Sequence, residues 1–112
     1  LAGEIVGWFQ GRSEVGARAL GARSILAHPG SEATRVRVNT VKRREQWRPL
    51  APSVLAEHAH DWFNGVPPCG SPYMSITASV RVEVREKVAA VVHVDGSARL
   101  QTVSTELNPL YH

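Results

Sequence analysis

The sequence predicts a mixed α/β (α+β) fold: a twisted, mixed β-sheet with flanking helices and more strand than helix. Short segments rich in β-branched and aromatic residues alternate with glycines and prolines, a pattern typical of strands and turns. One segment, residues 32–41, repeats its larger side chains at helical spacing. The 112 residues are 43% hydrophobic and 21% charged, close to the average for a globular domain. We therefore expect one domain, or one domain and part of another.

The N-terminal segment is expected to form two strands joined by a loop. Residues 4–10 (EIVGWFQ) and 24–27 (SILA) have the composition of strands. The glycines between them argue against a continuous helix and favour a loop whose backbone can approach a ligand closely; they are Gly11, Gly16 and Gly21.

A helix over residues 32–41 follows, with Ser31 as its candidate N-cap. Two prolines then keep the chain extended, before a predicted strand at 53–55 and a short helix at 57–63 that ends at an Asn-Gly pair.

The second half is predicted to be mostly strand. Residues 73–84 alternate partly between apolar and polar, and residues 88–94 form an apolar run. Asp95-Gly96 is a strong turn signal, so residues 99–103 are expected to return as the second arm of a hairpin. A further helix is predicted to begin near residue 108.

Charge is unevenly distributed along the chain. Residues 12–48 contain nine basic and three acidic residues, a balance of +6, whereas the remainder carries −3. A local cationic region in a nearly balanced chain points to an anionic ligand, with nucleic acid as the alternative partner.

Other features bear on location. No apolar run approaches the roughly 20 residues needed to span a bilayer, and the single cysteine, Cys69, cannot form an internal disulfide. We expect a cytoplasmic protein without membrane contact, with no metal ligands in this segment. Because the chain opens without a methionine, we also expect it to be part of a longer polypeptide.

The first candidate site is the segment from Gly11 to Ser24. Its arginines, Arg12, Arg18 and Arg23, are interleaved with glycines. Guanidinium groups and accessible backbone N–H groups both suit a phosphate or carbamoyl phosphate oxygen. Each arginine alone could be a solvated surface charge, but the three together favour a common anion.

The second candidate is Lys42, Arg44 and Arg48. If the helix ends before them, side chains two residues apart can share a face and reach one phosphate chain. Pro49 disfavours a helical conformation at Arg48, which supports an early end. The alternative is a basic helix C-terminus that complements the helix dipole.

The third candidate surrounds the predicted turn at 95–96. Ser97, Arg99 and Gln101 are expected to share a face of the returning strand, beside His93. A plain hairpin needs none of these polar side chains, so we consider catalysis by His93 and ligand binding by the other three. A histidine in an apolar run can equally be a hydrogen-bonded core residue.

Several long motifs, in this order, carry a family resemblance: VGWFQGRSEVGARALGARSIL, VNTVKRREQWRPLAPSVL, SPYMSI, VVHVDGSARLQTV and NPLYH. They resemble the C-terminal region of the NodU/CmcH family of O-carbamoyltransferases, and the likeness covers essentially all 112 residues. The resemblance implies that residues 1–112 form part of a YrdC-like domain, truncated at its C-terminal end and inactive alone. Enzymes of this family modify nodulation factors and antibiotics.

In that family the YrdC-like part is understood to activate carbamoyl phosphate with ATP and Mg²⁺ to give carbamoyl adenylate and pyrophosphate. An N-terminal ASKHA-like domain of the same polypeptide, which holds iron, then transfers the carbamoyl group to a hydroxyl. The family's Lys-x-Arg element is matched by Lys42 and Arg44, whereas its Ser-x-Asn element has no match here. Ala17 replaces the family's usual proline, and His28 its usual aspartate, which leaves any role of that aspartate open.

Two alternatives to an enzyme stay open at this point. The basic region could bind RNA, since YrdC relatives serve tRNA modification, although the acidic remainder argues against it. The segment could also be a non-catalytic scaffold for a neighbouring domain. The acceptor hydroxyl and the oligomeric state do not follow from the residues.

Overall fold

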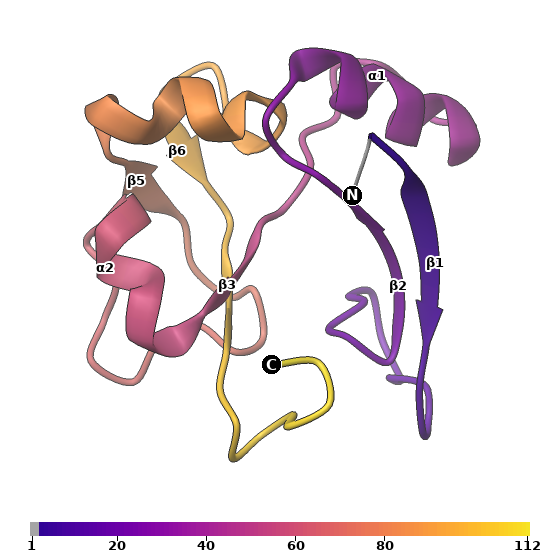
Figure 1. Cartoon of the computed structure of the whole chain (residues 1–112), viewed down its shortest axis with the longest axis vertical. Helices are drawn as coiled ribbons and strands as arrows, with labels where there is room; N and C mark the ends of the chain where they lie inside the picture. Colours follow the sequence, from indigo (N-terminus) through magenta and orange to yellow (C-terminus); the bar gives the residue numbers. More distant parts are fainter. Residues whose placement is uncertain (1–2) are drawn as a thin grey trace.

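The computed structural model describes residues 3–112. Helix α1 and the 3-10 helix η2 lie side by side across one end of the molecule (Figure 1). Below them, the β1–β2 ribbon stands on one side, while α2 and the strands near it stand on the other. The elements in chain order are β1 (Ile5–Phe9), β2 (Arg23–Ala27), α1 (Glu32–Val41), β3 (Ser53–Leu55), η1 (Ala56–His58), α2 (Ala59–Trp62), β4 (Phe63–Asn64), β5 (Ala78–Val80), η2 (Val82–Val91), β6 (Ser97–Ala98) and β7 (Gln101–Val103).

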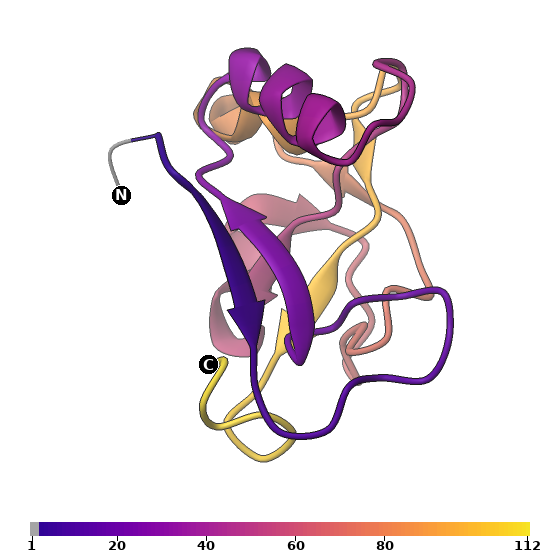
Figure 2. The ribbon, with the colours of Figure 1, turned by 90° about the vertical axis from the view of Figure 1, so that its right-hand side faces the viewer.

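The mixed α/β (α+β) class is confirmed, but the strands do not form one sheet. β1 and β2 pair antiparallel, β3 and β7 pair parallel, and β4, β5 and β6 form an antiparallel sheet in that order. The predicted single twisted sheet is therefore wrong among the described residues. The strands are only two to five residues long, so each offers few ladder hydrogen bonds, and the long loop between β1 and β2 extends to one side of the paired strands (Figure 2).

The elements predicted in the first half are confirmed. The two strands around the glycine-rich loop, the helix at 32–41 and the strand at 53–55 all form. Ser31 caps α1 by accepting a hydrogen bond from Ala33 N at 3.2 Å. The predicted short helix is present as η1 followed by α2.

Helix α1 ends at Val41, before Lys42 and Arg44, as Pro49 predicts. Arg43 N donates to Thr40 O, and Arg44 N donates to Asn39 O, at 3.0 and 3.1 Å. This pair of bonds is the Schellman motif, which requires a left-handed residue after the cap. Arg43 occupies that position with φ of 49°. The chain beyond the helix therefore turns sharply instead of continuing extended, which the sequence argument did not anticipate.

The strands predicted in the second half are mostly wrong. Only Ala78–Val80 of residues 73–84 is a strand, and Val82–Val91 forms η2. The apparent alternation fails because Val82 is exposed. Val82–Val91 consists of two short helical pieces joined by a kink at Val88 (φ −132°, ψ 31°), and Val84, Val88 and Val91 pack in or against the core. A short apolar run does not by itself distinguish a strand from such a helix.

The predicted hairpin is also wrong, although its turn is present. His93 N donates to Ser97 O at 2.8 Å, and Gly96 adopts φ of 80°. The run before the turn is not a strand, so β6 pairs with β5 and β7 pairs with β3. Residues 105–111 form turns where a helix was predicted to begin.

The core lies between α2, η2 and the three-stranded sheet. Its most buried members include Leu100, Val80, Phe63 and Ala98. No helix in residues 3–112 combines the length and apolar character that crossing a bilayer requires. Cys69 is a free, exposed thiol.

Candidate functional site

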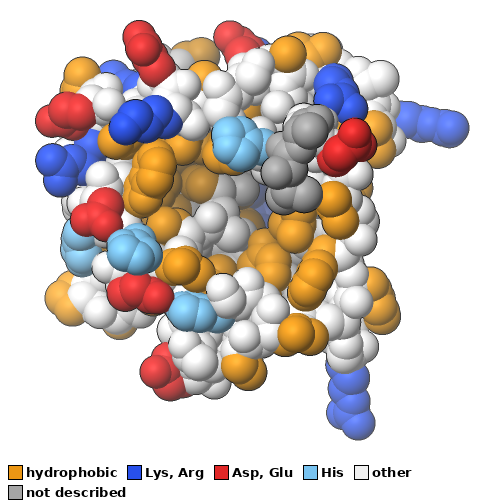
Figure 3. Space-filling model, in the orientation of Figure 1, with side chains coloured by type: hydrophobic (Ala, Val, Ile, Leu, Met, Phe, Trp, Pro, Cys, Tyr) orange, Lys and Arg blue, Asp and Glu red, His pale blue; other side chains and the backbone are white. Residues whose placement is uncertain are grey.

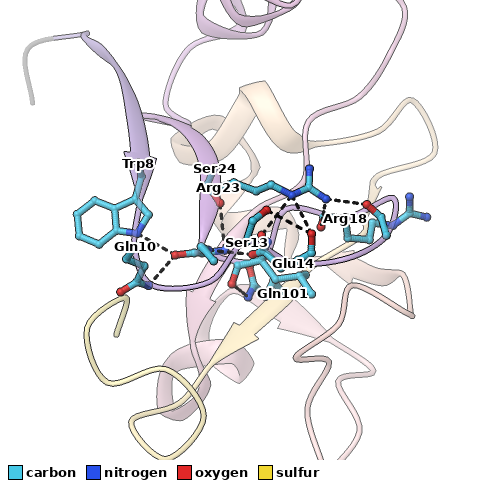
Figure 4. Close-up of polar contacts among 12 residues, drawn as sticks. Trp8, Gln10, Ser13, Glu14, Arg18, Arg23, Ser24 and Gln101 are labelled. Atoms are coloured by element: carbon cyan, nitrogen blue, oxygen red, sulfur yellow. Dashed lines mark hydrogen bonds and ion pairs between the residues drawn. The ribbon is translucent and has the colours of Figure 1, made fainter.

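The loop between β1 and β2 is held by a carboxylate–guanidinium frame (Figure 4). Glu14 Oε1 accepts hydrogen bonds from Leu20 N and Ala22 N at 2.7 and 2.8 Å. Arg23 lies 3.5 Å from the same carboxylate and donates to Gly16 O at 2.6 Å. The sequence places Arg23 in β2, so its side chain reaches back over the loop that precedes it. The frame gives the loop a defined shape.

The Glu14 carboxylate is ionised in this frame. Its partial burial acts to raise its pKa, but the hydrogen bonds from the backbone and the charge of Arg23 outweigh that effect, and the pKa lies below its ordinary value. The side chain is only 17% exposed, so we infer that its charge serves to hold the loop in shape.

The far end of the loop is held by three side chains from outside it. Trp8 Nε1 and Gln10 Nε2 both donate to Gly21 O, at 2.8 and 2.6 Å. Gln101 Nε2 donates to Leu20 O at 2.8 Å, and its Oε1 accepts from Ser53 Oγ. The loop is therefore fixed against both the β1–β2 ribbon and the β3–β7 pair, and it presents Arg18 from a stable position.

The second half of the site is built on buried Asn39 in α1, which is 0% exposed. Arg44 Nε donates to Asn39 Oδ1 at 2.6 Å, and Arg44 Nη2 donates to Pro49 O at 3.2 Å. Asn39 Nδ2 in turn donates to Arg48 O at 3.0 Å. One amide thus orients the Arg44 guanidinium and the segment that follows it.

A cavity of about 840 Å³ lies between these two halves, with walls from β2, α1, β3 and the segment around Arg99. The space-filling view shows a hollow near the centre of the face seen in Figure 1, with apolar side chains around it (Figure 3). Five cationic side chains line the cavity, and no Asp or Glu of residues 3–112 does; the five are Arg18, Lys42, Arg44, Arg48 and Arg99.

The charges of this cluster repel one another. Burial lowers the pKa of Lys42, and the nearby charge of Arg44 lowers it further. Burial likewise lowers the pKa of Arg99, followed by the charges of Arg18 and Arg44. The pKa of Arg44 is lowered by burial and by Arg48, against a smaller opposing effect of Glu45. An anion in the cavity would relieve this repulsion.

Arg99 has a buried hydrogen-bond donor without an acceptor among the described residues. Its Nε is buried and has no hydrogen-bond partner within the part of the chain that the structure describes. A buried donor without a partner costs free energy, so a ligand acceptor at this point would be stabilising.

The structure thus brings together five of the ten residues predicted from the sequence. Arg23 instead belongs to the loop frame, and Gln101 supports that loop. Arg12 is exposed and does not line the cavity.

The third candidate group is divided by the structure. His93 Nδ1 lies 3.1 Å from Ser97 Oγ, which donates to Asp95 Oδ1 at 2.7 Å, and neither His93 nor Ser97 lines the cavity. Arg99 lines the cavity, Gln101 bonds the loop at Leu20, and Ser97 bonds Asp95, so the three side chains do not share one face. The chain changes pairing partner between β6 and β7, which breaks the alternation that a continuous strand would give.

The sequence argument missed three residues that shape the site: Glu14, Asn39 and Trp47. Glu14 and Asn39 have their effect through hydrogen bonds to segments six to nine residues away, which no local pattern reveals. Trp47 lies in the second of the motifs that carry the family resemblance, and that motif assigns it no role of its own. The structure places it in the cavity wall but leaves 74% of it exposed.

Comparison with known proteins agrees with the family resemblance. The family described as "Carbamoyltransferase C-terminus" matches residues 1–112. The chain is 50% identical over 112 residues to nodulation protein NolNO of Sinorhizobium fredii (strain NBRC 101917 / NGR234), covering 97% of this chain and 16% of that protein. It is 49% identical over 113 residues to nodulation protein NolO of Bradyrhizobium diazoefficiens, covering 97% and 20%.

A third relative is named for an enzymatic activity. The 3'-hydroxymethylcephem-O-carbamoyltransferase of Streptomyces clavuligerus is 49% identical over 115 residues, covering 99% of this chain and 20% of that protein. The chain spans about a fifth of the length of these curated relatives, or less. The match over every residue of the chain shows that it belongs to the carbamoyltransferase C-terminus family, the C-terminal region of the NodU/CmcH carbamoyltransferases.

Proposed function

We propose that this chain is the region of an O-carbamoyltransferase that binds carbamoyl phosphate and ATP and activates the carbamoyl group as carbamoyl adenylate. The activated group would then pass to a hydroxyl of a natural product. The observation that carries the proposal is a cavity lined by five cations and by no carboxylate of residues 3–112. The name of the Streptomyces clavuligerus relative supports the reaction class.

The chemistry explains why so many cations are needed. Carbamoyl phosphate and ATP are both multiply charged anions that repel each other. Water would split carbamoyl phosphate into carbamate and phosphate, and a carbamate oxygen would then attack the α-phosphorus of ATP and displace pyrophosphate, so negative charge develops on both leaving groups. Catalysis of this kind depends mainly on positioning and on neutralising charge. Lys42 and Arg44 are proposed to contact the reacting groups, while Arg18, Arg48 and Arg99 bind the phosphates.

Magnesium would enter with the nucleotide, because the cavity wall offers cations where a protein-held Mg²⁺ needs oxygen ligands. His, Cys, Asp and Glu of residues 3–112 form no group of three or more that could hold a metal ion. The iron, like the ASKHA-like domain that the family resemblance implies, is proposed to belong to another part of the polypeptide. His93 is not included in the proposed site, because no described contact connects it to the cavity.

The test is carbamoyl-phosphate-dependent exchange of pyrophosphate into ATP, measured on the full-length polypeptide. Lys42→Ala and Arg44→Ala are expected to abolish exchange with the fold intact. Lys87→Ala removes an exposed cation that does not line the cavity, and it should leave exchange unchanged.

Full exchange in both cavity variants would refute the assignment. Binding of RNA with steeply salt-dependent affinity, in the absence of carbamoyl phosphate binding, would favour the RNA-binding alternative in its place. Stable folding without binding of either ligand would leave the scaffold alternative.

A further inference from the structure

The most unusual exposed side chain in the cavity wall is Trp47. Large aromatic side chains are seldom left open to water unless they contact a ligand or a partner, yet Trp47 is 74% exposed. It lines the same cavity as the five cations. The fold as described gives the ring no packing role that would account for its position.

The segment that carries Trp47 is nevertheless fixed. The backbone turns at Glu45–Arg48, where Arg48 N donates to Glu45 O at 3.2 Å. Asn39 Nδ2, from inside the molecule, donates to Arg48 O at 3.0 Å. The ring therefore stands on a backbone that is held from both sides.

Arg48 also contacts the ring directly. Its guanidinium carbon lies 5.5 Å from the centroid of the Trp47 ring, within the range of a cation–π interaction. Arg48 Nε is in turn held by Glu45 Oε2 at 2.7 Å. The high exposure of Trp47 in spite of this contact leaves room for a second planar group on the indole.

The surroundings of Trp47 define the shape of a ligand. The cavity wall that contains Trp47 combines the five cations with apolar residues, including Pro49, Leu50 and Met74. A molecule that suits both has a flat, weakly polar end joined to a polyanionic end. Nucleoside triphosphates have this construction.

We propose that Trp47 is the stacking platform for the base of the bound nucleotide and that it sets a preference for purines over pyrimidines. This inference rests on the proposed function, since it assumes that the cations bind the nucleotide phosphates. Every base has a π-face, and a purine covers more of an indole ring than a pyrimidine does. Stacking of a base on an aromatic side chain changes affinity by roughly five- to 150-fold.

The test compares three anions, ATP, CTP and inorganic tripolyphosphate, each with Mg²⁺, by calorimetry on the full-length polypeptide. Trp47→Ala is expected to weaken ATP binding about tenfold or more, to weaken CTP binding less, and to leave tripolyphosphate binding unchanged. Trp47→Phe keeps a stacking surface and should retain most of the affinity for ATP. Tyr73→Ala is the matched control, because Tyr73 is a 65% exposed aromatic that does not line the cavity.

Unchanged ATP affinity in Trp47→Ala would overturn the inference. So would an equal loss for ATP and tripolyphosphate, because that would show a distorted cation cluster instead of a lost stacking surface. Unchanged ATP affinity with a lowered melting temperature would assign the ring to a contact with another domain. If wild-type protein bound neither ATP nor tripolyphosphate, the proposed function itself would fail, and this inference with it.

Discussion

The Glu14 carboxylate gives the sharpest prediction about how the site is held. Its Oε1 accepts from Leu20 N and Ala22 N at 2.7 and 2.8 Å, in the loop that presents Arg18. Glu14→Ala removes both bonds, and an unsatisfied buried donor costs about 1–3 kcal/mol. Because water can reach part of this loop, we expect a loss of about 2–4 kcal/mol in the free energy of unfolding. Glu14→Gln keeps a neutral acceptor and should cost about 1 kcal/mol.

Urea denaturation measures both changes, with Glu86→Ala as the control because Glu86 is also acidic but exposed. The pH dependence supplies a second check. The pKa of Glu14 is lowered from its ordinary value of 4.5, so its stabilising contribution is complete above about that pH and is lost as pH falls through the folded-state pKa. The difference in stability between wild type and Glu14→Ala should thus be constant near neutrality and shrink in acid.

Two results would refute this reasoning. Equal urea midpoints for Glu14→Ala and Glu86→Ala would show that the two backbone bonds contribute nothing net. A difference that persisted undiminished at pH 3, well below the ordinary pKa, would show that the effect of the substitution does not depend on the charge of the carboxylate.

Two further substitutions test the backbone conformations. Arg43 has φ of 49° at the end of α1, where glycine is favoured, so Arg43→Gly should raise the free energy of unfolding by about 0.5–1 kcal/mol, and a lower urea midpoint would contradict the Schellman assignment. Gly21 has φ of 104°, and a Cβ there would lie 2.5 Å from the Tyr111 ring, so Gly21→Ala should lower the thermal midpoint by several degrees. Gly11→Ala is the matched control for Gly21→Ala, because φ at Gly11 is also positive but no atom lies near its Cβ; equal midpoints for the two alanine variants would show that Tyr111 does not pack as described.

The sequence was most informative where its signals are local. Ser31 and the spacing within residues 32–41 are enough to predict α1 with its observed bounds. Pro49 is enough to predict that the helix ends before Arg48. The sequence offers the cationic groups as separate candidate sites, and the structure places Arg18, Lys42 and Arg44 in the wall of one cavity. Whether they bind the proposed ligands is for the exchange assay to decide.

The failures occurred where a pattern has two physical solutions. The valines of residues 82–91 suggest the alternation of a strand, but Val82 is exposed, and the chain forms two short helical pieces joined at Val88 that pack on the core. The turn at 95–96 forms, but strand pairing is decided by partners elsewhere in the chain, so β7 joins β3. Asn39 appears in the sequence as one polar residue in a helix. Only its burial shows that it organises the site.

The partners of Arg23 and Arg44 distinguish their roles better than sequence spacing does, whereas Arg48 lines the cavity although Glu45 pairs with it. Arg23 is paired with the Glu14 carboxylate, so its charge is neutralised within the protein. Arg44 is held by an amide oxygen and a backbone carbonyl, which fix its position without a direct bond to a carboxylate of residues 3–112.

Arg99 lacks even these hydrogen bonds at one position, because its Nε is buried and has no partner in residues 3–112. A protein that needed these cations only for stability would gain by pairing them with carboxylates, because clustered like charges destabilise the folded state. The repulsion is therefore best understood as a cost that bound anions offset. It follows that phosphate or pyrophosphate should raise the melting temperature of the wild type more than that of a variant lacking one cavity cation.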